Sequence, residues 1–122
     1  MKIVHGRAER VPSEQRGTVT GEAWFDPILP ATDGTTITTV FFAPGARTYW
    51  HSHENGQILQ VLAGRGLICT DGEQPRTIAA GDVVWVPPGE RHWHGAAPDS
   101  FLTHTAISLG ATHWAEEVAG DD

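Results

Sequence analysis

The sequence contains one cysteine, Cys69, among its 122 residues. An intrachain disulfide is therefore impossible, and the cysteine content gives no indication of an oxidising compartment. Cys69 lies in the strand-like run Gly66–Thr70, where a buried structural thiol is a better interpretation than a nucleophile. A chain of this length can bury one hydrophobic core without disulfide cross-links, so we expect a single domain.

Basic residues are also few, with 8 Lys and Arg against 15 Asp and Glu and a net charge of −7. They are dispersed along the chain, whereas nucleic-acid binding needs clustered Lys and Arg, so no nucleic-acid partner is expected. No apolar run approaches membrane-spanning length. The N-terminus has no basic region followed by an apolar run, as a signal peptide would. We therefore expect a cytoplasmic protein with no membrane partner.

No stretch of eleven or more residues from Gly17 onward shows a convincing helical period. The pattern is instead a series of short β-type runs separated by Gly- and Pro-containing turns, which predicts an all-β sandwich or barrel. The expected strands are Thr18–Phe25, Thr35–Phe42, Gln57–Leu62, Gly66–Thr70, Arg76–Ile78, Val83–Val86, Arg91–His94 and Phe101–Ser108.

The two ends of the chain are less regular than its middle. Residues 1–16 are polar and poorly periodic, and we interpret them as an arm that packs on the barrel or on a partner subunit. The barrel domain then spans residues 17–122. Its tail, Thr112–Val118, is predicted to be either a last strand or a short helical turn.

Histidine is the residue type that stands out, because several of the seven in the chain lie at alternating positions. Residues two apart on a strand face the same side, so His51 points with His53 and His92 points with His94, while Trp93 points the opposite way. Two further alternating rows would face the same interior. They are Gln57, Leu59 and Val61, and Leu102, His104, Ala106 and Ser108.

If these rows meet inside one barrel, several imidazoles converge with Gln57 in an otherwise apolar cavity. Buried imidazoles need partners, so the pattern predicts either a metal ion or a hydrogen-bond network. The alternative is that some of these histidines face solvent and the others are hydrogen-bonded core residues.

Two segments of the chain resemble the paired motifs of the cupin superfamily. The first reads Gly45-x5-His51-x-His53-x3-Gln57-x6-Gly64, and the second reads Gly81-x5-Pro87-x-Gly89-x2-His92. The resemblance implies a small double-stranded β-helix, or jelly-roll barrel, with a metal held by His51, His53, Gln57 and His92.

The sequence around these motifs is similar to that of the manganese-dependent bacterial hydroxynitrile lyases of cupin fold, over roughly residues 38–107. Those proteins carry a glutamine at the Gln57 position and histidines that match His94 and His104. The resemblance implies a Mn²⁺ cofactor, although His and amide donors also suit Fe²⁺, Ni²⁺ and Zn²⁺. It implies cleavage of a cyanohydrin to an aldehyde or ketone plus cyanide, and the reverse addition.

Two positions depart from the common cupin pattern. Gln57 replaces the usual glutamate of the first motif, and Ala96 replaces the usual asparagine after the second. A neutral amide leaves a bound divalent ion with its full charge, which favours Lewis-acid chemistry over reduction of dioxygen.

His94 or His104 would then carry the proton, because an imidazole accepts and donates protons near neutrality. His94 could instead orient a metal ligand, and His104 could be a core histidine bonded to a backbone carbonyl.

The expected substrate pocket is apolar, with Leu59 among its inward-facing residues and Thr38 and Val40 at its mouth. Such a pocket would take a small molecule with an aryl or alkyl group. Two other functions remain open, a metal-dependent dioxygenase and a non-catalytic metal- or ligand-binding protein. Small cupins of this type resemble homodimers or homotetramers in which an N-terminal strand crosses to the partner.

Overall fold

The computed structural model describes residues 1–6 and 13–119, and these residues form eleven strands and no helix. The predicted all-β class is confirmed. No helix within these ranges is long and apolar enough to cross a membrane. The strands are β1 (Val19–Thr20), β2 (Ala23–Thr32), β3 (Thr35–Phe42), β4 (Arg47–Thr48), β5 (His51–His53), β6 (Gln57–Thr70), β7 (Arg76–Ala79), β8 (Val83–Val86), β9 (His92–Ala96), β10 (Leu102–Leu109) and β11 (Thr112–Trp114).

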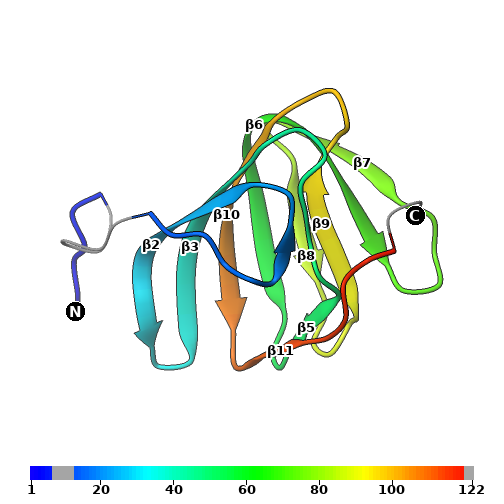
Figure 1. Ribbon diagram of the computed structural model, residues 1–122. Helices are drawn as coiled ribbons and strands as arrows, with labels where there is room; N and C mark the ends of the chain where they lie inside the picture. Colours follow the sequence, from blue (N-terminus) through cyan, green and yellow to red (C-terminus); the bar gives the residue numbers. More distant parts are fainter. Residues whose placement is uncertain (7–12, 120–122) are drawn as a thin grey trace.

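The strands curl into a nearly closed barrel of two layers that share the long strand β6 (Figure 1). The first part of β6 pairs with β10 and β8 in one layer, and its last part pairs with β9 and β7 in the other. Gly64, the last fixed position of the first motif, lies within this strand. Gly64 has φ +80°, and a Cβ there would come within 2.0 Å of the Phe101 carbonyl oxygen, so only glycine fits.

The inward-facing side chains stack in layers across β3, β10 and β6. One layer joins Val40, His104 and Val61, and the next joins Thr38, Ala106 and Leu59. The alternating burial of β10 follows the predicted row. The apolar core consists of Ala23, Phe25, Val40, Phe42, Ala46, Leu59, Val61, Ile68, Ile78, Val86, Ala96, Leu102 and Ala106.

The structure differs from the expected strands mainly at β2. The predicted run Thr18–Phe25 is interrupted at Gly21, and β2 continues through Pro27 and Pro30 to Thr32. These prolines are tolerated because β2 is the end strand of the sheet order, and its register with β3 shifts between Pro27 and Leu29 and again before Thr32.

The ends of the chain give a mixed outcome. The tail forms a strand, β11, which pairs with β5 at one end of the barrel (Figure 1). Part of the predicted arm, residues 7–12, lies outside the described residues. Within the rest of the arm, Glu14 forms a bridge with Phe25. The packing of the arm on a partner subunit stays a prediction.

The barrel also has large apolar side chains on its outside. Trp24 and Phe41 are cross-strand neighbours on β2 and β3, and both remain exposed. Val83 and Trp85 are exposed on β8. Exposed apolar surface of this kind is common where proteins associate, and the expected homodimer or homotetramer stays a prediction.

The close approach of β4 and β9 provides a test of the barrel packing. A Cβ at Gly95 would lie 2.2 Å from the Ala46 carbonyl oxygen, so Gly95→Ala must push the two strands apart. We expect the substitution to lower the free energy of unfolding by about 2 kcal/mol in urea denaturation. Gly17→Ala is the control, because a Cβ there meets nothing within 4 Å. Equal unfolding curves for the two variants would contradict this packing.

Candidate metal centre

Three short segments bring the predicted metal ligands together. His51 and His53 lie on β5, His92 begins β9 directly opposite His51, and Gln57 begins β6. One ligand atom from each of the three histidines lies within 4.8 Å of the others, and all three side chains are buried. Gln57 is also buried and contacts His92. The structure thus brings these four residues together, and none of the three histidines faces solvent.

Hydrogen bonds at Nδ1 fix how each imidazole points. His51 Nδ1 lies 2.9 Å from the Tyr49 carbonyl oxygen, and His92 Nδ1 lies 2.9 Å from the Glu90 carbonyl oxygen. Because a carbonyl can only accept, both Nδ1 atoms carry the proton in the neutral ring and Nε2 keeps its lone pair. His53 Nδ1 bonds Thr112 Oγ1 at 3.0 Å, and its buried Nε2 has no partner. Each ring is thus held with Nε2 available as a ligand.

Gln57 places its side-chain oxygen beside the Nε2 atoms of the three imidazoles. Its Nε2 donates to Ser108 Oγ at 3.0 Å, which leaves Oε1 3.2 Å from His92 Nε2. Two acceptor atoms at this distance repel unless a proton or a cation is shared between them. Burial lowers the pKa of His92, which disfavours the proton. The donor set therefore fits a divalent cation bound by His51, His53, His92 and Gln57.

Burial also keeps the other two triad histidines neutral, as metal binding requires. Desolvation is the largest effect on the pKa of His51, which it lowers well below its ordinary value, and the neighbouring His92 adds to the shift. The same two causes lower the pKa of His53 to about 4. Trp114, opposite His51 on β11, covers the His51 ring with a centroid distance of 4.5 Å.

The two predicted proton carriers form a buried pair beside the triad. His104 Nε2 lies 3.0 Å from His94 Nδ1, and the His94 ring lies 5.1 Å from the His51 ring between centroids. Burial lowers the pKa of both, that of His104 to about 4. His94 Nε2 is buried without a partner. His104 thus bonds a second imidazole, and a hydrogen bond with its own backbone opposes the effect of burial on its pKa.

The predicted pocket residues lie on the inner face of the barrel near this pair. Val40 is the cross-strand neighbour of His104, and Thr38 is the neighbour of Ala106. Val40 and Leu59 are fully part of the apolar core, while Thr38 is half-buried. Their role in substrate binding stays a prediction.

The sequence does not predict three contacts of the centre, which Ser108, Thr112 and Trp114 make with Gln57, His53 and His51. The alternation along β10 predicts that Ser108 faces inward, but it does not predict the hydrogen bond to Gln57. Thr112 and Trp114 belong to the tail, and they reach the centre only because β11 pairs with β5. No local pattern predicts that pairing.

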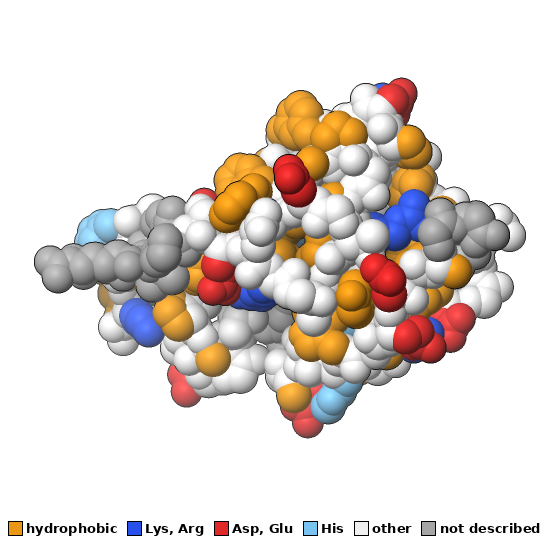
Figure 2. Space-filling view, viewed as in Figure 1, with side chains coloured by type: hydrophobic (Ala, Val, Ile, Leu, Met, Phe, Trp, Pro, Cys, Tyr) orange, Lys and Arg blue, Asp and Glu red, His pale blue; other side chains and the backbone are white. Residues whose placement is uncertain are grey.

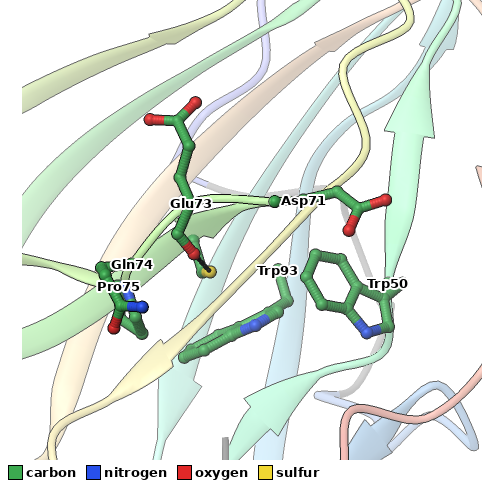
Figure 3. Close-up of a pocket in the computed structure, with 8 residues that line it drawn as sticks. Trp50, Asp71, Glu73, Gln74, Pro75 and Trp93 are labelled. Atoms are coloured by element: carbon green, nitrogen blue, oxygen red, sulfur yellow. Dashed lines mark hydrogen bonds between the residues drawn. The ribbon is translucent and has the colours of Figure 1, made fainter.

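The five imidazoles of the centre are buried. The histidines visible on the face drawn in Figure 2 lie at its margins, in agreement with this burial. A separate hollow lies on the outer side of β9. Trp93 lines it, because this residue alternates with His92 and His94 along the strand and points away from them. Figure 3 shows this hollow, where Trp93 and Trp50 face the Asp71–Pro75 loop. Trp93 is itself buried and packs with Cys69 and Val118, in agreement with the prediction that it points away from His92 and His94.

The buried thiol lies beside the same hollow. Cys69 bonds the Glu73 carbonyl oxygen at 3.3 Å and packs with Trp93 and Val118. This surrounding agrees with the predicted structural thiol.

Comparison with known proteins places these features in a family context. The family model for the cupin domain matches residues 38–103, which include both motifs. A protein named (R)-mandelonitrile lyase from Granulicella tundricola is 44% identical over 108 residues, which cover 84% of this chain and 82% of that protein.

Solved structures agree on the fold. A cupin-like protein from Thermotoga maritima is 36% identical with a TM-score of 0.84, covering 98% of this chain and 93% of that one. The polyketide cyclase RemF from Streptomyces resistomycificus is 20% identical with a TM-score of 0.76, covering 97% and 85%. At that identity the second likeness concerns the fold alone.

The depressed histidine pKa values predict an acid-sensitive barrel. A histidine with a folded pKa of about 4 and an unfolded value of about 6.5 binds more protons when unfolded. Stability is therefore complete above pH 6.5 and falls as the pH drops toward 4. We expect the free energy of unfolding of metal-free protein to decrease steadily over this window in urea titrations. A constant value between pH 6.5 and 5 would contradict a neutral, buried histidine cluster.

Proposed function

This chain belongs to the cupin family, and from that premise we propose that it is a metal-dependent lyase acting on a cyanohydrin. The reaction yields an aldehyde or ketone and hydrogen cyanide, and the same site catalyses the reverse addition. The observation that carries the proposal is a neutral His–Gln donor set beside a buried imidazole pair. It occurs in a chain 44% identical to a protein named (R)-mandelonitrile lyase.

The ion would be held by His51, His53 and His92 through Nε2 and by Gln57 through Oε1. Mn²⁺ is the proposed ion, and Fe²⁺, Ni²⁺ and Zn²⁺ are accepted by the same donor types. When bound, a divalent ion stabilises negative charge on the substrate oxygen and lowers the pKa of its hydroxyl. Among the described residues no carboxylate joins the donor cluster, so this charge is not neutralised by the protein.

The imidazole pair supplies the proton transfers. His94 Nε2 has a free lone pair when His94 Nδ1 donates to His104 Nε2, and it accepts the hydroxyl proton of the cyanohydrin. The carbon–carbon bond to the nitrile then breaks, its electron pair leaves with cyanide, and the oxygen forms the carbonyl. His94 returns the proton to cyanide, so each turnover leaves the protein unchanged.

The apolar wall beside the pair sets the class of substrate. Val40 lies in the same layer as His104, and Leu59 lies in the same layer as Ala106. Both side chains are apolar. We propose that these residues with Thr38 receive the organic group of the cyanohydrin, which favours an aryl or alkyl substituent.

Turnover of mandelonitrile tests the reaction. We expect metal-stripped protein to release benzaldehyde after reconstitution with Mn²⁺, Fe²⁺, Ni²⁺ or Zn²⁺, and His51→Ala to lower the rate by at least about 100-fold. His5→Ala is the control, because His5 is exposed and far from the triad in the chain. No benzaldehyde with any ion, or equal rates for His51→Ala and the parent, would refute the lyase proposal. Oxygen consumption with iron would instead support a dioxygenase.

The amide ligand is tested by metal content. Gln57→Ala removes one of four donors, so we expect less bound metal per chain after dialysis, measured by elemental analysis. Gln60→Ala on the same strand is the matched control, since Gln60 is exposed on the opposite face of β6. Unchanged metal content in Gln57→Ala would show that Gln57 is not a ligand.

A further inference from the structure

Gln57 differs from the histidine ligands because its two ends have opposite chemistry. An amide oxygen binds a cation, whereas an amide NH₂ group carries two protons and repels one. The side chain is nearly symmetric in shape, so packing alone does not distinguish the two orientations. Some neighbouring group must therefore decide which end faces the three imidazoles.

Ser108 is the group that contacts the other end of the amide. It lies on β10 directly opposite Gln57 on β6, and both side chains are buried on the inner face of the barrel. Gln57 Nε2 donates to Ser108 Oγ at 3.0 Å, while Oε1 faces His92 Nε2 at 3.2 Å. The hydroxyl thus holds the NH₂ group away from the imidazole nitrogens.

The amide has a competing arrangement that would abolish its role as a ligand. His92 Nε2 carries a lone pair, because Nδ1 of that ring donates to the Glu90 carbonyl oxygen. If the amide turned over, its NH₂ group would donate to His92 Nε2 and occupy the space between the ligands. In the ligating orientation the NH₂ group donates to the Ser108 hydroxyl, so removing that hydroxyl leaves a buried donor without this partner and destabilises the orientation that binds metal.

We propose that Ser108 is a positioning residue that stabilises the metal-binding orientation of Gln57. The serine hydroxyl accepts from Nε2 and so keeps Oε1 toward the ion. This inference rests on the proposed metal site and assigns to Ser108 the stabilisation of its amide ligand. It also links Ser108 to the amide at position 57, since a glutamate there would present oxygen whichever way it turned.

Replacing the amide at position 57 by a carboxylate tests whether Ser108 acts through the orientation of the amide. We compare Mn²⁺ dissociation constants by titration calorimetry for the parent, Ser108→Ala, Gln57→Glu and the double variant Gln57→Glu/Ser108→Ala. Loss of a partner that orients a ligand weakens metal binding by about 10- to 100-fold, and we expect that loss in the parent background. In the Gln57→Glu background we expect Ser108→Ala to change the dissociation constant by no more than about twofold.

Two further comparisons separate orientation from packing. Ser108→Thr keeps the acceptor and should bind Mn²⁺ within about twofold of the parent, whereas the size-matched Ser108→Val should not. This pair also serves if Ser108→Ala fails to fold. Thr105→Ala on the same strand is the control, because Thr105 contacts Thr39 on the opposite side of β10 and not the ligands.

The outcomes distinguish this inference from the proposed function. A parent protein that binds none of the four ions overturns the metal site itself. A parent that binds Mn²⁺, with Ser108→Ala equal to it, overturns only the role of Ser108. Equal losses in the parent and Gln57→Glu backgrounds, or equal binding by Ser108→Thr and Ser108→Val, would also overturn it.

Discussion

Four lone pairs directed into one buried space are the constraint on which the centre depends. Three imidazole Nε2 atoms and the Gln57 oxygen face one another, and Gln57 Oε1 lies only 3.2 Å from His92 Nε2. Acceptors in an apolar interior gain nothing from one another and lose their hydration. The surrounding hydrogen bonds nevertheless direct them together. A positive charge at the centre would remove this penalty, and this is the physical argument for the proposed cation.

Each of the two motifs encodes part of that arrangement locally. His51 bonds the carbonyl of Tyr49, and His92 bonds the carbonyl of Glu90, so both rings use the backbone two residues upstream. The chain that delivers a ligand therefore also fixes its tautomer. His53 has no such local partner and depends on Thr112 of β11. One ligand of the three is thus oriented by a strand distant in the sequence.

This difference explains how much of the centre could be predicted from sequence. Alternation along strands was sufficient to place His51, His53, His92 and His104 on inner faces, and the motif spacing predicted the barrel. It could not predict that the tail would pair with β5, since that contact depends on the whole barrel being formed. The strand β2 was misplaced for a related reason, because its prolines are acceptable only at the end of a sheet.

The neutrality of the ligands has a consequence for the chemistry of the proposed lyase. A divalent ion held by three imidazoles and an amide keeps its full charge inside a medium of low dielectric, where attraction to an anion is strong. The reaction produces an anion at each step, first on oxygen and then on cyanide. Burial keeps the adjacent His94–His104 pair neutral, so a lone pair is free for the released proton, and a neighbouring anion would favour the protonated form that burial disfavours. With a glutamate at position 57 the ion would already be partly neutralised, and Gln57 preserves the charge that the reaction uses.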